Sequence, residues 1–259
     1  MASWKIIPLH IGTLAPYDKS VFTYGRNGGV RIEAPCIVWI VTDGRTTVVV
    51  DAGPSLPDRA NRAHGPYTCP PEQTLAASLA RVGVDPAAVD AVILSHLHWD
   101  HVGGVDVFSR ARFYVQREEL RAAVAPVMTQ RIAYEVGLAG LLPTWMTVFD
   151  RMEVLDGDHV LAPGLEILTL PGHTPGIQGL LVETGIGPAL IASDAIPLVD
   201  NWEGDRTLRH IPNGIHADLY AYEATFKKME ARARWVLPGH DGRAFDPERY
   251  PFLKGATGD

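Results

Sequence analysis

The sequence predicts an α/β fold in which two sheets pack face to face and helices cover their outer surfaces. Short apolar runs with strand character recur through both halves, and segments with helical spacing occur at intervals between them. No linker separates the halves, so we expect a single domain over residues 1–259. The chain is 46% hydrophobic and 20% charged, which is ordinary for a globular protein with a sizeable core.

The first half of the chain is expected to alternate strands and loops with two helices. Residues 35–41 and 46–50 are rich in β-branched side chains, and the Asp-Gly pair at 43–44 between them predicts a hairpin. Residues 72–83 have helical spacing and end at a glycine. Residues 16–31 contain several glycines and are expected to form an irregular loop. The remaining expected elements are strands at 6–11, 91–94 and 112–116 and a helix at 117–125.

The second half repeats this rhythm of strand and turn. A helix is expected at 221–232, and strands are expected at 153–155, 165–170, 179–183, 189–192 and 235–237. Segment 127–148 is apolar and is expected to be partly helical, with most of its side chains packed against the core. A share of these side chains could instead line a pocket or a subunit contact, because exposed apolar surface usually has a purpose.

The composition narrows the classes of function. A net charge of −7 argues against a nucleic-acid partner, which normally requires a basic surface. No apolar run is long enough to cross a membrane, and residues 1–8 lack the features of a signal peptide. Cys36 and Cys69 are too few for a disulfide framework or a thiolate zinc site, so we expect two free thiols. A cytoplasmic enzyme that acts on a small molecule fits these features.

One short cluster dominates the candidate functional residues. The apolar run at 91–94 predicts a buried strand. Just after it come four possible metal ligands: His96, His98, Asp100 and His101. They therefore fall on the loop that leaves this strand, where metal and catalytic groups are usually held. Imidazole and carboxylate groups at this density are typical of a metal site.

Three further residues have the same placement after apolar runs. His173 and His240 each follow a Leu-Pro-Gly sequence, and Asp194 follows Ile-Ala-Ser. Together with the first cluster they offer five histidines and two aspartates, enough for two ions that share one carboxylate. Ligands of this kind without a thiolate favour zinc, with manganese, iron or cobalt as alternatives. Asp51, at the end of another strand, is expected to hydrogen-bond to a ligand histidine or to serve as a turn residue.

These motifs resemble those of the metallo-β-lactamase fold hydrolases. They read Ser-His-Leu-His-Trp-Asp-His-Val-Gly-Gly at 95–104, Leu-Pro-Gly-His-Thr-Pro-Gly at 170–176, Ser-Asp-Ala at 193–195 and Leu-Pro-Gly-His-Asp at 237–241. The resemblance runs from about residue 35 to 241 and implies a four-layer αββα sandwich. It also implies one ion on His96, His98 and His173, a second on Asp100, His101 and His240, and Asp194 as the bridge.

Within that superfamily the chain looks most like the N-acyl homoserine lactonases, which are quorum-quenching enzymes. Passages 113–120, 172–178 and 238–241 carry this similarity. It implies that a metal-bridging hydroxide attacks the ester carbonyl of a lactone ring while Asp100 shuttles the proton. These lactonases carry a tyrosine three residues after the bridging aspartate, and its hydroxyl helps to hold the substrate carbonyl. Pro197 stands there in this chain, so the metal ions or another hydroxyl must take over that role.

Several aromatic residues are candidates for the substrate pocket, although core packing is the commoner role of each. The candidates for an apolar wall along an acyl chain are Trp99, Trp145 and Trp202. The candidates for the missing hydroxyl are Tyr24, Tyr220 and Tyr222. The other histidines are expected on the surface or in loops, with His64 the best placed to reach a pocket. The resemblance also leaves room for a homodimer.

Other functions remain open at this point. The same fold and ligands suit a thioester hydrolase of the glyoxalase II kind or a β-lactam hydrolase. An iron-dependent oxidoreductase is the alternative from a different enzyme class, because the fold can also hold iron. A third hypothesis is a non-catalytic binding protein. The intact set of seven possible metal ligands argues against it.

Overall fold

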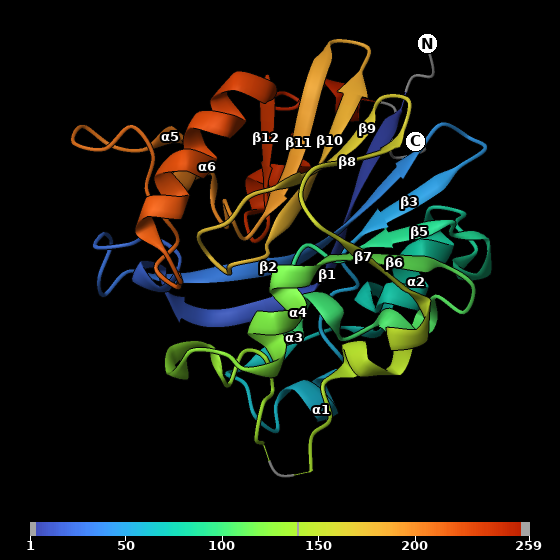
Figure 1. The fold of residues 1–259 in the computed structure, drawn as a ribbon, viewed down its shortest axis with the longest axis horizontal. Helices are drawn as coiled ribbons and strands as arrows, with labels where there is room; N and C mark the ends of the chain where they lie inside the picture. The colour runs from blue at the N-terminus through green and yellow to red at the C-terminus, as the bar shows by residue number, and fades with distance from the viewer. Residues whose placement is uncertain (1–3, 139, 255–259) are drawn as a thin grey trace.

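The computed structural model describes residues 4–138 and 140–254, and their strands form two sheets (Figure 1). The larger sheet has the order β4-β1-β2-β3-β5-β6-β7, with β1 (Lys5–Asp18), β2 (Arg31–Thr42), β3 (Thr47–Val50), β4 (Tyr67–Thr68), β5 (Ala91–Ile93), β6 (Arg112–Gln116) and β7 (Met152–Leu155). The smaller sheet has the order β12-β11-β10-β9-β8, with β8 (His159–Ala162), β9 (Leu165–Thr169), β10 (Gln178–Thr184), β11 (Gly187–Ser193) and β12 (Trp235–Pro238).

Helices cover the outer face of each sheet. The helices in the described ranges are α1 (Pro57–Ala60), α2 (Leu75–Arg81), α3 (Trp99–Val102), α4 (Arg117–Val124), α5 (Val199–Glu203) and α6 (Leu219–Arg232), and α2, α4 and α6 pack on these faces. Leu79 of α2 and Ala123 of α4 are buried against the larger sheet, whereas Tyr222 and Met229 of α6 are buried against the smaller one. The layers therefore run helix, sheet, sheet, helix, which confirms the expected α/β sandwich (Figure 1). No helix within the described ranges is long and apolar enough to cross a bilayer.

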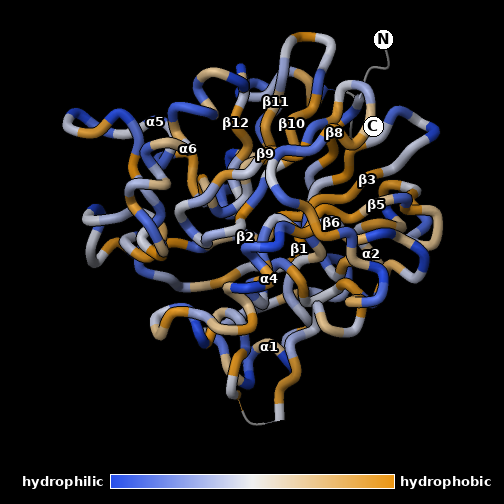
Figure 2. Tube along the Cα trace, viewed as in Figure 1, coloured by the Kyte–Doolittle hydropathy of each residue, from blue (hydrophilic) through white to orange (hydrophobic). Residues whose placement is uncertain are grey.

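The main core lies between the two sheets and follows from the two-residue period of a strand. On β2, Trp39 and Val41 point toward the smaller sheet and share a core with Leu180 of β10. Val38 and Ile40 point the other way, toward the helices on the outer face. Figure 2 shows hydrophobic residues along the central strands and hydrophilic residues in the outer loops. Each large apolar side chain buried here stabilises the fold by about 1.5–3 kcal/mol.

Most elements begin and end close to the predicted positions. β2 and β3 form the predicted antiparallel hairpin, and Gly44 in its turn has a φ of +87°, which glycine adopts without strain. Helix α6 begins at Leu219, two residues before its predicted start. The side chain of Asp218 accepts hydrogen bonds from the amides of Tyr220 and Ala221 and so caps this earlier first turn.

Several features of the structure differ from the expectation. The predicted loop at 16–31 is wrong at both ends, because two register shifts let β1 bend and continue to Asp18, opposite the first residue of β2. Segment 127–148 is partly helical, as expected, through 3-10 helices at Met128–Gln130 and Thr144–Arg151, but Met128, Leu142 and Met146 are exposed and not packed against the core. Strand β8 has no counterpart among the predicted elements, because its exposed residues His159 and Val160 lack an alternating pattern.

The topology brings several strand ends together. β3 and β5 are parallel neighbours in the larger sheet, and β11 and β12 are parallel neighbours in the smaller one. Parallel neighbours have their carboxyl ends at the same edge of a sheet, and ligand-binding loops commonly follow such ends. Asp51, His96, Asp194 and His240 all follow these four strands, so the fold places them at one common edge of the sandwich.

Candidate metal centre

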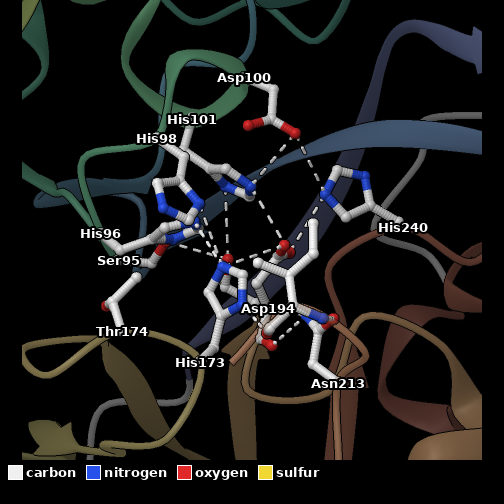
Figure 3. A network of polar contacts seen from close by, with 12 residues as sticks. Ser95, His96, His98, Asp100, His101, His173, Thr174, Asp194, Asn213 and His240 are labelled. Atoms are coloured by element: carbon white, nitrogen blue, oxygen red, sulfur yellow. Dashed lines mark hydrogen bonds and ion pairs between the residues drawn. The ribbon is translucent and has the colours of Figure 1, made fainter. Parts of the chain in front are cut away.

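The seven predicted ligand side chains converge at this edge (Figure 3). They come from the loop and helix α3 after β5, from the connection between β9 and β10, and from the residues after β11 and β12. Six of them are at most 6% exposed, and Asp100 has a side chain that is 13% exposed. They form three overlapping groups with ligand atoms within 4.8 Å of one another: His96, His98 and His173; His96, His101 and Asp194; and Asp100, His101 and His240.

The first group consists of imidazoles that crowd one another. Nε2 of His173 lies 3.3 Å from Nε2 of His96 and 3.1 Å from Nδ1 of His98. The rings of His96 and His98 stand nearly perpendicular, at 78°, with centroids 4.5 Å apart. Three ring nitrogens aimed at one point have the arrangement of ligands around a single ion.

The third group, Asp100, His101 and His240, combines a carboxylate with two imidazoles. Oδ2 of Asp100 lies 3.8 Å from Nε2 of His101 and 3.6 Å from Nε2 of His240. These distances are too long for direct hydrogen bonds but suit atoms that share a cation between them.

Asp194, a member of the second group, lies between the first and third groups. Its Oδ1 is 3.5 Å from Nε2 of His101 and 3.1 Å from Nε2 of His240, while its Oδ2 is 3.7 Å from Nε2 of His173. One oxygen therefore faces each group. Gly239 makes this placement possible, because a Cβ there would come within 2.5 Å of Oδ1 of Asp194.

Hydrogen bonds on the far side of the rings fix which nitrogen faces the centre. Nδ1 of His173 donates to the carbonyl of Ile215 at 2.7 Å, and Nδ1 of His240 donates to the carbonyl of Pro35 at 3.0 Å. Nδ1 of His96 lies 3.0 Å from the hydroxyl of Ser95, and Nδ1 of His101 lies 2.8 Å from Asp51. With Nδ1 engaged, each of these rings presents Nε2, as ligand histidines do.

Asp51 organises several of these contacts. Its carboxylate accepts hydrogen bonds from the amide and hydroxyl of Ser95, from the hydroxyl of Ser193 and from His101. Asp51 and Ser193 both have a positive φ, of +65° and +47°, which is uncommon for residues other than glycine and often marks functional sites. Asp51 therefore has the position expected for the hydrogen-bond partner of a ligand histidine.

Burial and charge shift the pKa values of this cluster in opposite directions. Burial holds the pKa of His96 and of His98 well below the usual value, and neighbouring histidines add to the effect. Burial also lowers the pKa of His101, but Asp100, Asp51 and Asp194 outweigh it and raise this pKa to about 9. In the same way Asp194 raises the pKa of His240 above its usual range.

The donors present fit a pair of divalent cations. Nε2 of His101, Nε2 of His240 and Oδ1 of Asp194 are buried and make no hydrogen bond of good geometry among the described residues, although Asp194 and His240 approach to 3.1 Å. Buried polar atoms without partners are costly, and three of them facing one another indicate a ligand that they share. Nitrogen and carboxylate donors without sulfur suit zinc and similar first-row ions.

The aromatic candidates for the pocket have different surroundings. Trp99 is half-buried next to Asp100 and stacks on His64 at a centroid distance of 4.0 Å. His64 is therefore no surface residue: its side chain is only 3% exposed and lies 3.3 Å from Glu135. The structure does not bring Trp145 to the centre, because Trp145 is 5% exposed within the core beneath the larger sheet.

The remaining candidates also lie away from the centre or point elsewhere. Trp202 stacks on His210 beside α6, and Tyr24 is 44% exposed against the edge of His216. Among the tyrosines, Tyr220 is 89% exposed. The hydroxyl of Tyr222 lies 3.2 Å from the backbone carbonyl of Asp194 and is engaged there.

Pro197 and the two cysteines complete the predicted features. The carbonyl of Pro197 accepts a hydrogen bond from the amide of His240 at 2.8 Å, so this residue lies beside the centre but offers no hydroxyl. Cys36 and Cys69 are free thiols, as predicted, and Cys36 is buried.

Two residues that sequence reasoning missed also contact the ligand loops. Glu119 of α4 is fully buried and accepts hydrogen bonds from Leu97 and Thr174, which neighbour ligand histidines. Asn213 is 1% exposed and donates to the carbonyl of Asp194 at 3.0 Å. Glu119 stands within a passage that resembles the lactonases and could have been found there, whereas nothing in the sequence around Asn213 marks it.

Comparison with known proteins agrees with this geometry. Residues 32–240 match the metallo-beta-lactamase superfamily. An N-acyl homoserine lactonase from Bacillus thuringiensis is 33% identical over 200 residues, which cover 73% of this chain and 74% of that protein. A crystal structure of a quorum-quenching N-acyl homoserine lactone lactonase superposes with a TM-score of 0.73 at 25% identity and covers 95% of both chains.

A second solved structure adds a bound product. It is an N-acyl homoserine lactone hydrolase with N-hexanoyl-L-homoserine at its catalytic metal centre, and it superposes with a TM-score of 0.72 at 25% identity. It covers 94% of this chain and 95% of the other. The extent of these matches and the shared motifs show that the chain belongs to the metallo-beta-lactamase superfamily and, within it, to the family of the N-acyl homoserine lactonases.

Proposed function

We propose that this protein is a dinuclear-metal hydrolase that opens the ester ring of lactones, with N-acyl homoserine lactones as its substrates. The observation that carries the proposal is the position of Asp194, whose two oxygens face different groups of imidazoles. A carboxylate in that position is suited to bridge two ions a few ångströms apart. The activity of the Bacillus thuringiensis relative, at 33% identity, supports the substrate class.

The seven side chains have separate roles in this proposal. His96, His98 and His173 would hold one ion, Asp100, His101 and His240 would hold the other, and Asp194 would contribute an oxygen to each. Zinc is the ion we propose, because the donors are imidazoles and carboxylates. When bound, a pair of such ions supplies a nucleophile from water at neutral pH and polarises the ester carbonyl.

Asp100 is the residue we assign to proton transfer. Its side chain is the most exposed of the seven, so it is the one that a substrate entering from solvent can approach. Hydrolysis of a lactone removes a proton from water and delivers one to the ring oxygen that leaves. A carboxylate within reach of both atoms accepts the first proton and returns it to the second. Nε2 of His101 and Nε2 of His240 lie 3.8 Å and 3.6 Å from Oδ2 of Asp100, so the carboxylate stands beside both rings.

The test is a panel of substrates measured on one preparation of the protein. It contains N-acyl homoserine lactones, simple lactones and glutathione thioesters, and acid release is followed with a pH indicator. We expect ring opening of the lactones that disappears after chelation and returns with zinc. Turnover of the thioesters alone would replace the lactonase assignment with a thioester hydrolase. The His98→Ala variant serves as the inactive control.

A further inference from the structure

Helix α4 contributes a buried carboxylate that belongs to neither group of ligands. Glu119 is 0% exposed, yet no arginine, lysine or histidine forms an ion pair with it among the described residues. Instead it accepts four hydrogen bonds, from the amide of Leu97 at 3.0 Å, the hydroxyl of Tyr134 at 2.7 Å, the hydroxyl of Thr174 at 2.6 Å and the amide of Gly176 at 3.2 Å. Carboxylates are rarely buried without a counter-ion, so the burial of Glu119 requires an explanation in the contacts that it makes.

Three of the four donors, Leu97, Thr174 and Gly176, belong to the segments that carry the first group of imidazoles. Leu97 stands between His96 and His98, and Thr174 directly follows His173. These segments follow strands of different sheets, β5 and β9. Gln178 joins their bases, because its backbone amide donates to the carbonyl of Ser95 at 2.8 Å, but it contacts neither Leu97 nor Thr174 through a hydrogen bond among the described residues. Glu119 spans them with one side chain.

The third segment joined to Glu119 lies against a ligand ring. Tyr134 donates its hydroxyl to Glu119, and its ring lies 4.5 Å from the ring of His98. Gln130 in the same segment donates to the carbonyl of His173 at 2.7 Å. The segment between α4 and β7 therefore contacts both His98 and the backbone of His173.

We propose that Glu119 is a positioning residue that holds the loops of His98 and His173 at the separation needed to bind the first metal ion. This inference rests on the proposed function, because it concerns the metal centre of that reaction. Glu119 acts through the backbone of Leu97 and Gly176 and through the hydroxyl of Thr174, without touching the substrate or the ion.

The hydrogen-bond pattern requires a carboxylate at this position. Oε1 of Glu119 accepts from the amide of Leu97 and from Tyr134, and Oε2 accepts from the amide of Gly176 and from Thr174. Each oxygen therefore faces one backbone N–H, which cannot reverse its direction. The NH2 group of a glutamine would point at one of these amides in either orientation and leave it without an acceptor.

Close packing leaves little room for the loops to adjust. A Cβ at Gly176 would come within 2.1 Å of the backbone nitrogen of Glu119, so the loop after His173 rests directly on the first turn of α4. Because the helix and the loop after His173 are in direct contact, a change in hydrogen bonding at Glu119 should shift that loop.

The experiment compares Glu119→Gln with the matched control Glu118→Gln on the same helix. The side chain of Glu118 is 56% exposed and forms its ion pair among the described residues with Arg121, so Glu118→Gln leaves the loops of His98 and His173 unchanged. Zinc is titrated into each metal-free protein against a competing chelator. We expect Glu119→Gln to bind one of two zinc ions about 10–100-fold more weakly than the wild type, as is common for groups that orient metal ligands. The control should match the wild type.

A purely structural role gives a different result. In that case Glu119→Gln would lower the melting temperature equally with and without zinc, and its zinc affinity would equal that of the wild type, which would overturn the inference. If Glu119→Gln fails to fold, Tyr134→Phe removes a single donor, and unchanged zinc affinity in that variant overturns the inference equally. Zinc binding without lactone hydrolysis in the wild type would refute the proposed function while leaving the role of Glu119 measurable.

Discussion

Oδ2 of Asp51 lies 2.8 Å from Nδ1 of His101, so a residue at the end of β3 determines how a histidine on α3 faces the metal centre. A carboxylate can only accept at this contact, and Nδ1 of His101 must therefore carry the proton. Nε2 of the same ring is left to face Asp100 and Asp194. Orientation of this kind is a large part of what makes a histidine a strong ligand.

Replacing Asp51 with asparagine should weaken metal binding about 10–100-fold, because the amide supports the His101 tautomer poorly and no longer carries the charge. Competition with a chromogenic chelator measures the effect. The matched control is Asp58→Asn, since Asp58 is exposed on α1. Equal zinc affinity in Asp51→Asn and wild type would show that Asp51 is only a turn residue.

Removal of metal should lower the thermal stability of the protein. The unpartnered buried atoms of His101, Asp194 and His240 destabilise the metal-free fold, and a bound ion satisfies them. Free zinc at 100 times its Kd should stabilise the folded state by about 2.7 kcal/mol per site through mass action. Differential scanning calorimetry before and after chelation measures the shift. His98→Ala should show a smaller zinc-dependent shift and no hydrolysis; a full shift in this variant would exclude His98 as a ligand.

Pro197→Tyr tests whether the missing hydroxyl limits the reaction. The carbonyl of residue 197 accepts from His240, and any residue keeps that carbonyl, so the substitution leaves this contact intact. A hydroxyl that reaches the substrate carbonyl should raise kcat/KM on N-acyl homoserine lactones about tenfold or more, since single donors of this type contribute at least that much. Pro197→Phe is the control without a hydroxyl. No gain from Tyr over Phe would indicate that the natural substrate is bound in a different way.

The ion pair of Asp158 and Lys228 predicts a pH-dependent contribution to stability. Burial raises the pKa of Asp158, but hydrogen bonds from Lys228 at 2.6 Å and from Thr169 outweigh it and lower this pKa. The stabilisation is therefore fully present above the unfolded pKa near 3.8 and is lost as the pH falls through the lower folded value.

Asp158→Asn should accordingly lower the free energy of unfolding by less than about 1 kcal/mol, since the pair is only partly buried. Urea unfolding should give the same difference between variant and wild type from pH 8 to about 5, and a smaller one below pH 4. A difference that grows on acidification would contradict the assignment.

Much of the candidate metal centre could be predicted because the proposed ligands leave a local signal in the sequence. The histidine cluster after β5, and His173, Asp194 and His240 after apolar runs, are visible without any knowledge of the fold. The hairpin at Gly44 and helix α6 follow from turn and capping chemistry in the same way.

The rest depends on contacts between distant segments. Glu119 is an ordinary helix residue by spacing, and its role exists only because α4 packs against the loop at Gly176. His64 has no motif around it, and its stacking on Trp99 arises from tertiary packing. Trp145 is a pocket candidate only because it is a large aromatic residue, and the fold buries it in the core. Side-chain roles of this kind are decided by tertiary neighbours, which a local pattern does not record.

The central claim is that two ions share Asp194, and elemental analysis of the purified protein tests it most directly. The wild type saturated with zinc should contain two ions per chain, and Asp194→Ala should contain fewer than two because both groups of ligands lose an oxygen. A single ion in the saturated wild type, or two ions retained by Asp194→Ala, would contradict the account.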